Sequence, residues 1–180
     1  MKNRIRRIGL SLALAMVLLV GFTVPLTAAN PTVSITVTAE VVSITNTKAS
    51  WAIGTVAVDA VVYFSTDGTQ DDDWSQIENT GSVTVDVEIQ GTDIEGGDYD
   101  WVLAAAAGSE QYSLYANNTT GGSNYVIEVK SSTYNDICTD LAADGTYDWS
   151  MKFTAPSGFN ANDDGEQKTT TVTLVASKHT

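Results

Sequence analysis

The sequence predicts an all-β protein: a single antiparallel β-sandwich, immunoglobulin-like or jelly-roll, with about eight strands and at most one short helix. The first observation is strict alternation, with Val83, Val85, Val87 and Ile89 on one face of a predicted strand and polar residues on the other. The second is that most later apolar segments repeat this period and are separated by turn-forming residues. The third is the lack of a strand–helix–strand rhythm, which argues against a parallel α/β sheet. Spacing leaves both sandwich topologies open.

Residues 1–29 have the pattern of a secretory signal peptide, so the domain is expected to span residues 30–180. Basic residues precede an almost wholly apolar run over residues 8–26, and small residues follow it at the expected cleavage site. Because the run is also about long enough to span a bilayer, an uncleaved anchor is the alternative, although Pro25 favours cleavage. We expect a secreted protein, extracellular or at a cell surface, with no membrane attachment after the leader is removed.

The chain that follows the leader is strongly acidic. It keeps five lysines and no arginine against 22 acidic residues, a formal charge of −17. Such a charge repels phosphate backbones, so no nucleic acid is expected as a partner. The simplest interpretation is a solvated acidic surface, and cation binding is the alternative. Cys138 is the only cysteine, so no internal disulfide can form, and its apolar neighbours predict a small buried side chain.

Several strands are expected in the first half of the domain. Residues 32–47 alternate at first and then continue as a β-branched stretch, which predicts one long strand or two short ones. Residues 51–54 and 56–64 supply further strand-like apolar side chains, and residues 67–74 read as a polar, acidic loop. A turn at residues 79–81 leads into the alternating strand.

The second half repeats the two-residue period with one exception. In residues 131–143, apolar side chains lie at helical spacing, which predicts a single short helix: Tyr134, Ile137, Cys138 and Leu141. The predicted inward-facing sets are Tyr99, Trp101 and Leu103; Tyr112, Leu114 and Ala116; Tyr125, Ile127 and Val129; Tyr147, Trp149, Met151 and Phe153; and Val172 with Leu174.

The sequence lacks the combinations of residues that common catalytic sites need. The only histidine, His179, is next to the last residue, which argues against a serine or cysteine triad and against a histidine-rich zinc site. Paired carboxylates of a glycosidase stay open as an alternative, since such an enzyme needs only two acids at the right separation. We expect no enzyme activity and no resident cofactor apart from Ca²⁺.

Calcium is the best-motivated ligand. Acidic residues crowd one loop, and a second loop resembles the first half of an EF-hand, where hard oxygen ligands alternate along the chain. The second half of that motif fails, because its twelfth position is Thr171. The alternative is a pair of ordinary acidic turns. The candidate ligands are Asp67, Asp71, Asp72 and Asp73 in the first loop and Asn160, Asn162 and Asp164 in the second.

Two further patterns concern the surface. Asn117 and Asn118 begin overlapping N-glycosylation sequons in a polar loop. Trp51 and Trp74 stand beside loops, where their rings are candidates for stacking on a polysaccharide, whereas Trp101 and Trp149 belong to apolar alternating sets and are expected in the core.

Two short motifs resemble those of known surface proteins. Residues 77–87 resemble the N-x-G-x-x-x-x-x-V strand entry of secreted β-sandwich proteins of bacterial and archaeal surfaces, including the fibre-forming TasA and camelysin group. Residues 101–103 and 149–151 are similar to the Trp-x-hydrophobic motifs of WxL cell-surface domains. The resemblance implies a non-catalytic subunit of a surface fibre or coat.

Assembly is expected to occur by pairing of strand edges. Residues 32–47 are the candidate strand that completes a neighbour's sheet; alternatively, they pair within their own sandwich. The expected partners are further copies of the chain or other surface proteins. The competing functions are a carbohydrate- or calcium-binding adhesive module and a virion or other extracellular structural protein.

Overall fold

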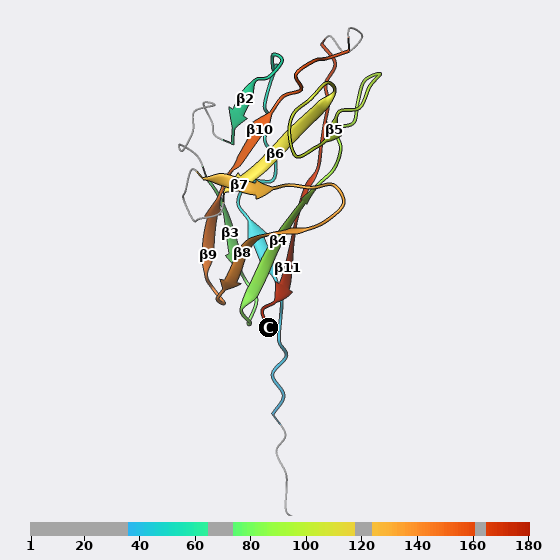
Figure 1. Ribbon diagram of the computed structural model, residues 1–180. Helices are drawn as coiled ribbons and strands as arrows, with labels where there is room; N and C mark the ends of the chain where they lie inside the picture. Colours follow the sequence, from blue (N-terminus) through green and yellow to red (C-terminus); the bar gives the residue numbers. More distant parts are fainter. Residues whose placement is uncertain (1–35, 65–73, 118–123, 161–164) are drawn as a thin grey trace, which may run out of the picture. The chain divides into compact units, whose positions relative to one another are not determined.

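The computed structural model describes residues 36–64, 74–117, 124–160 and 165–180 (Figure 1). The chain divides into two compact units, Met1–Thr38 and Ala39–Thr180. The described residues of the second unit form eleven strands and no helix, which confirms the predicted all-β sandwich. The strands are β1 (Ile44–Asn46), β2 (Val61–Tyr63), β3 (Ser75–Asn79), β4 (Val85–Gly91), β5 (Val102–Leu103), β6 (Gln111–Asn117), β7 (Tyr125–Glu128), β8 (Asn135–Leu141), β9 (Thr146–Trp149), β10 (Met151–Thr154) and β11 (Val172–Lys178).

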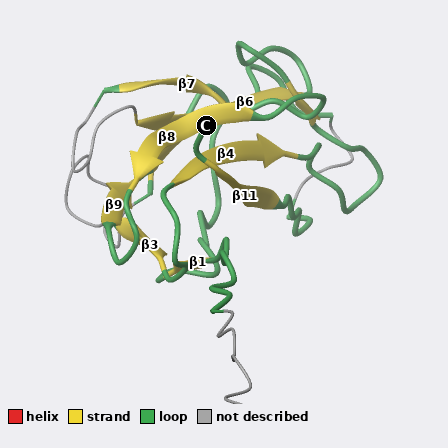
Figure 2. Ribbon diagram, turned by 90° about the horizontal axis from the view of Figure 1, so that it is seen from below, coloured by secondary structure: helices red, strands yellow, loops and turns green. Residues whose placement is uncertain are grey.

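The strands form three sheets. One has the order β1-β3-β9, the second has the order β2-β10-β6-β5 with β7 also paired to β6, and the third has the order β11-β4-β8. The named strands pair antiparallel except β5 with β6, which is parallel. Figure 2 shows β8, β4 and β11 side by side as one layer. Their inner side chains join those of the other two sheets in a single hydrophobic core.

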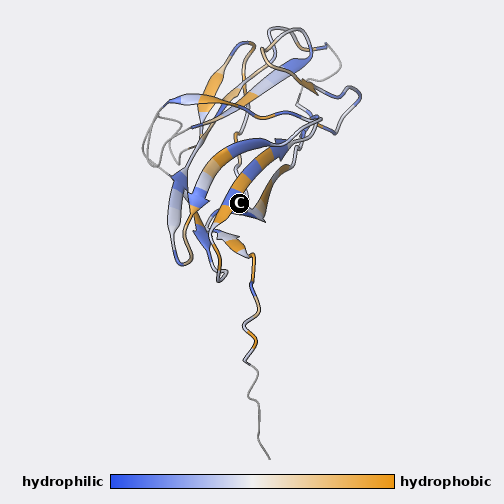
Figure 3. Cartoon of the chain, turned by 60° about the horizontal axis from the view of Figure 1, so that its bottom comes forward, coloured by the Kyte–Doolittle hydropathy of each residue, from blue (hydrophilic) through white to orange (hydrophobic). Residues whose placement is uncertain are grey.

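The predicted central strand is β4, and its alternation sets the core. Val85, Val87 and Ile89 are fully buried, while the polar residues between them are half-buried. Figure 3 shows the corresponding bands of apolar and polar residues along the strands. Because side chains of a strand point alternately to its two faces, this pattern gives the sheet one apolar face that must pack against another layer.

The predicted set Tyr147, Trp149, Met151 and Phe153 is buried, but it spans two sheets. Tyr147 and Trp149 belong to β9, which pairs with β3, whereas Met151 and Phe153 belong to β10, which pairs with β2 and β6. The change occurs at the buried Ser150, whose backbone N–H donates to Asn117 Oδ1 at 2.7 Å. One continuous stretch of chain therefore connects two of the three sheets.

The predicted helix in residues 131–143 is wrong, because this segment contains strand β8. The pairing of β8 with β4 shifts register twice: Val85 pairs with Leu141, Val87 with Cys138 and Glu88 with Asp136. Each shift leaves one extra residue on β8, as in a β-bulge, and breaks the two-residue period. The bulged strand therefore places its apolar residues at a spacing that resembles that of a helix.

Candidate functional site

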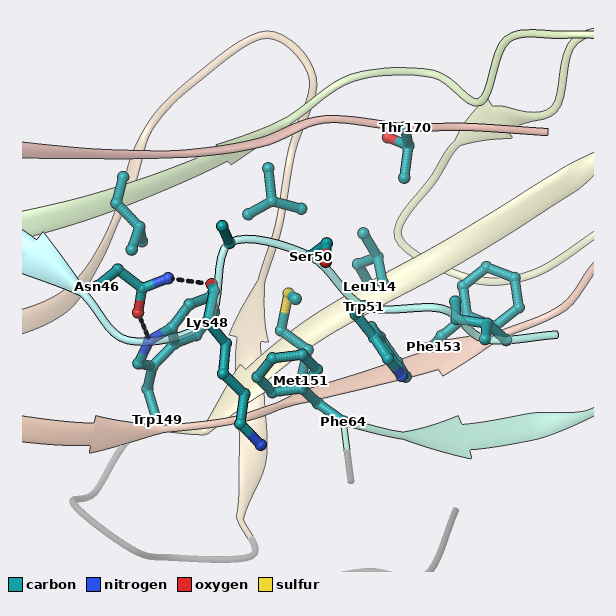
Figure 4. A pocket seen from close by; sticks show the side chains of 14 residues that line it. Asn46, Lys48, Ser50, Trp51, Phe64, Leu114, Trp149, Met151, Phe153 and Thr170 are labelled. Atoms are coloured by element: carbon teal, nitrogen blue, oxygen red, sulfur yellow. Dashed lines mark hydrogen bonds between the residues drawn. The ribbon is translucent and has the colours of Figure 1, made fainter. Parts of the chain in front are cut away.

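A cavity of about 370 Å³ lies between the sheets of the sandwich (Figure 4). Strands β9 and β10 contribute Trp149, Met151 and Phe153, and the opposite wall is formed by Val172 and Leu174 of β11. Asn46, the last residue of β1, and the irregular segment of residues 48–53 that follows this strand supply further lining side chains. The cavity is therefore built from all three sheets and one irregular segment.

Aromatic rings form one side of this cavity. Trp51 meets Phe64 edge to face, with ring centroids 5.3 Å apart and an interplanar angle of 75°. The ring centroids of Phe64 and Trp149 are 6.0 Å apart. The ring of Phe64 also carries the ammonium group of Lys48, whose Nζ lies 5.3 Å from the ring centroid. Among the described residues that line the cavity, Lys48 is the only charged one.

A partly buried hydrogen-bond network fixes the residues at one end of the cavity. Asn46 Oδ1 accepts from Trp149 Nε1 at 3.0 Å and from Ser75 Oγ at 2.6 Å, while its Nδ2 donates to the carbonyl oxygen of Lys48 at 2.6 Å. Ser75 Oγ also accepts from the backbone N–H of Lys48 at 3.2 Å. These contacts hold the start of the irregular segment against β3 and β9. The lining thus offers aromatic and aliphatic surface, hydroxyl and amide groups, and a single cation.

The second notable feature is the outer edge of β11. This strand ends its three-stranded sheet and pairs only with β4 over seven residues, from Val172 opposite Gly91 to Lys178 opposite Val85. In the described part of the chain, no backbone hydrogen bond connects its other edge to a neighbour. Val172, Leu174 and Ala176 are half-buried, whereas Val175 on the outer face is 36% exposed. An unpaired edge of this kind presents free N–H and C=O groups to another strand.

Ionic contacts hold the end of β11. Lys178 Nζ lies 2.5 Å from Glu40 Oε2, and His179 Nδ1 lies 2.8 Å from Asp86 Oδ1. The backbone N–H of Asp140 donates to the same Asp86 oxygen at 2.9 Å. The pKa of Asp86 is lowered, mainly by the backbone hydrogen bond from Asp140 and then by the hydrogen bond with His179. The pKa of His179 is raised by the same hydrogen bond and by the negative charge of Asp86.

Most of the predicted calcium ligands cannot be placed. Asp67, Asp71, Asp72, Asp73, Asn162 and Asp164 lie outside the described residues. Asn160 is described and half-buried, and it follows Phe159, whose ring stacks on Trp101. Within the described ranges, no group of three or more His, Cys, Asp or Glu side chains is close enough together to hold a metal ion. Calcium binding stays a prediction.

Of the two predicted sequon asparagines, the structure describes Asn117. Asn118 lies outside the described residues. Asn117 is fully buried at the end of β6, where its Oδ1 accepts the Ser150 hydrogen bond. Glycosylation of either asparagine stays a prediction.

The tryptophans and the cysteine follow their sequence patterns. Trp101 and Trp149 are buried, as predicted. Trp51 is half-buried and forms part of the cavity, and Trp74 is half-buried just before β3. Cys138 is partly buried against the core, and burial, followed by the charges of Asp86 and Asp140, raises the pKa of its thiol to about 11. It is therefore a packed thiol of low reactivity.

The sequence patterns did not point to the cavity. Lys48 and Asn46 stand in a stretch that reads as the end of a strand, and Leu174 reads as an ordinary inward residue. A weak signal was available in Trp51 and Ile53, since two large apolar side chains alternate there with small residues. Alternation indicates which side chains point inward, but it cannot show that they leave space between them.

Comparison with protein-family models, curated proteins and solved structures finds no match to the chain. The resemblance to the TasA and camelysin group therefore stays a prediction. In the described part of the chain, no helix has the length and apolar character needed to cross a bilayer.

Proposed function

We propose that this chain is a secreted, non-catalytic structural protein of a prokaryotic cell surface or extracellular matrix, and that its copies associate by pairing strand edges. The observation that carries the proposal is the unpaired edge of β11. Seven residues of regular strand end the sheet there, and this edge has no backbone partner in the described residues. Natural proteins usually cover or blunt such an edge when they stay monomeric, so a long open edge supports a role in strand addition.

The incoming strand is proposed to come from the segment that precedes β1 in a second copy. Val37, one of the β-branched residues of this segment, is 83% exposed. The sequence before it alternates apolar and polar residues, as a strand with one buried face does. The proposed donor is shorter than residues 32–47 and ends before Val41. β1 pairs with β3 of its own domain, and the backbone of Val41 and Ser43 is hydrogen-bonded to residues 80–82.

The test uses the chain that begins at Asn30, purified and imaged by negative-stain electron microscopy, with its mass measured by light scattering. We expect filaments or other regular assemblies of the unmodified chain. Val175→Lys puts a charge on the outer face of the β11 edge, a device that natural edge strands use against pairing, and is expected to give a folded monomer. Deletion of residues 30–38 is expected to give the same result.

Val126→Lys is the matched control. Val126 is 53% exposed on β7, so the substitution adds the same charge at an exposed valine of a different strand. It should leave assembly unchanged. Assemblies that persist in Val175→Lys would contradict the role of the β11 edge. Persistent monomers of the unmodified chain that are retarded on a polysaccharide column would favour an adhesive binding module instead.

A further inference from the structure

The cavity has a buried floor and an exposed rim. Its floor consists of aromatic and aliphatic side chains that are each at most 6% exposed: Phe64, Leu114, Trp149, Met151 and Phe153. Asn46, Ala49 and Ser50 also line it and are exposed, so the cavity opens to solvent (Figure 4). Apolar surface at the bottom of an open cavity gains stability when apolar side chains cover it.

The inner face of β11 is less completely covered than that of its neighbour β4. The inward residues of β4 are fully buried: Val85, Val87 and Ile89. Those of β11 are only half-buried: Val172, Leu174 and Ala176. Among the described residues, β11 has no backbone partner at its outer edge. Directly opposite residues of paired strands share a face, and Val172 and Leu174 line the cavity. Inward side chains of a strand added at this edge would therefore enter the cavity.

The other edge of the same sheet, β8, is protected against strand addition. Its pairing with β4 shifts register twice, and Asp140 has a positive φ of 60°. Asp136 and Asp140 are also exposed on this strand. Bulges and charged side chains are devices by which natural edge strands avoid pairing. β11 keeps continuous register with β4 over all seven of its residues, so it is the edge of this sheet that suits an added strand.

The segment before β1 has the pattern that this edge requires. Residues 32–38 are as long as β11, with apolar residues at positions 33, 35 and 37 and only Thr or Ser between them. The three apolar positions match the three inward positions of β11, and a strand of this kind has one apolar and one polar face. Pro31 precedes the segment and cannot donate a ladder hydrogen bond, which suits the residue before a strand.

The direction of the chain favours a second copy as the source of the added strand. Glu40 is ion-paired with Lys178 at the end of β11, and Asn46 lines the cavity together with residues near the start of β11. The chain therefore runs here from one end of β11 toward the other. Residues 32–38 could follow the edge of their own copy only if the chain reversed direction after Thr38. From Thr38 to Glu40 it contains no Gly, Pro, Asn or Asp, the residues that favour tight turns.

We infer that the cavity receives apolar side chains of residues 32–38 from a second copy: Val33, Ile35 and Val37. They form the inner face of the added strand, with Ile35 at its centre, while the backbone pairs with β11. The inference rests on the proposed function and adds the basis of partner selection. Backbone pairing accepts many sequences, whereas a cavity for alternate side chains selects strands with apolar residues at every second position.

The first test compares two variants of the chain that begins at Asn30. Ile35→Asp places a charge on the inner face of the added strand, and Thr36→Asp places the same charge one residue later on the outer face. By light scattering, Ile35→Asp should be monomeric at concentrations at least about tenfold above those at which the unmodified chain assembles. Thr36→Asp should assemble within about twofold of the unmodified chain.

The second test does not require the unmodified chain to assemble. A synthetic peptide of residues 30–38 is titrated by calorimetry into the Ile35→Asp chain, which keeps the cavity and the β11 edge. We expect one peptide per chain. A peptide with Ile35→Asp should bind at least about tenfold more weakly, and one with Thr36→Asp about as well as the unmodified peptide.

Substitutions in β11 test the location of the peptide. Leu174→Trp, added to the Ile35→Asp chain, fills the cavity from the β11 side and should weaken peptide binding at least about tenfold. Val175→Trp adds the same bulk on the outer face and should leave binding unchanged. Val172→Phe replaces Leu174→Trp if the latter does not unfold cooperatively.

The outcomes separate this inference from the proposed function. Discrimination between the two aspartate peptides supports the role of the cavity even if the unmodified chain forms no assemblies. Assemblies that tolerate Ile35→Asp as well as Thr36→Asp would support edge pairing but overturn the inference. Equal binding of the two aspartate peptides, no saturable binding of the unmodified peptide, or full binding to the cavity-filling variant would also overturn it.

Discussion

Replacement of Asn79 by alanine is expected to be among the most destabilising single changes to a polar residue of this domain. Asn79 is fully buried at the end of β3. Its Nδ2 donates to the carbonyl oxygens of Val83 at 2.8 Å and Leu141 at 2.9 Å, and its Oδ1 accepts from the backbone N–H of Gly81 at 3.0 Å. One amide side chain thus connects the end of β3 to the turn before β4 and to the end of β8.

The loss in free energy of unfolding depends on how well water can replace each hydrogen bond that Asn79 makes. The bond to Leu141 is buried, and leaving that carbonyl without a partner costs about 2 kcal/mol. The other two bonds are only partly buried, so water recovers some of their energy and each contributes about 0.5–1 kcal/mol. Asn79→Ala should therefore lower the free energy of unfolding by about 3–4 kcal/mol.

Urea unfolding followed by tryptophan fluorescence measures this loss from the midpoint and slope of the transition. Asn135→Ala is the control, because the Asn135 side chain makes one partly buried hydrogen bond, to the carbonyl oxygen of Glu128, and its removal should cost about 1 kcal/mol. The reasoning fails if Asn79→Ala destabilises the domain no more than Asn135→Ala does.

Three further predictions concern titratable groups. The pKa of His179 is raised above its ordinary 6.5 by Asp86, so their contact stabilises the fold fully below that pH and fades as the pH rises through the folded-state pKa. The pKa of Asp86 is lowered below 3.8, so the contribution of its ionised carboxylate to stability is lost only as the pH falls below that value. His179→Gln should remove the decrease in melting temperature that the wild-type chain shows as the pH rises through the pKa of His179. An unchanged dependence of melting temperature on pH would contradict the contact. Cys138, with a thiol pKa of about 11, should react with iodoacetamide far more slowly in the native chain than in urea, and equal rates would show that the thiol is accessible. The Tyr147 hydroxyl is buried without a hydrogen-bond partner in the described residues, so Tyr147→Phe should leave the free energy of unfolding within about 0.5 kcal/mol or raise it, whereas a loss above about 1 kcal/mol would reveal a partner.

Alternation in the sequence identified the fold class because it is a local property of a strand. Val85, Val87 and Ile89 were predicted to face inward from their spacing alone, and all three are fully buried. Tyr112, Leu114 and Ala116 on β6 follow the same rule. The rule failed on β8, where two register shifts against β4 insert extra residues. A bulge depends on the partner strand, so the sequence of β8 by itself could not reveal it.

For the candidate sites, too, some features follow from the sequence and others only from the tertiary structure. The sequence by itself determined which residue types are available: a single histidine and a single cysteine, an acidic chain, and apolar side chains at every second position. Tertiary structure alone decided that β9 and β10 enter different sheets, that β11 keeps an open edge, and that side chains from three sheets line one cavity. The physical reason is that periodicity records only which side of a strand is buried. Pairing partners, bulges and unfilled space depend on residues distant in the chain, as in the hydrogen bond from Asn79 to Leu141, 62 positions apart.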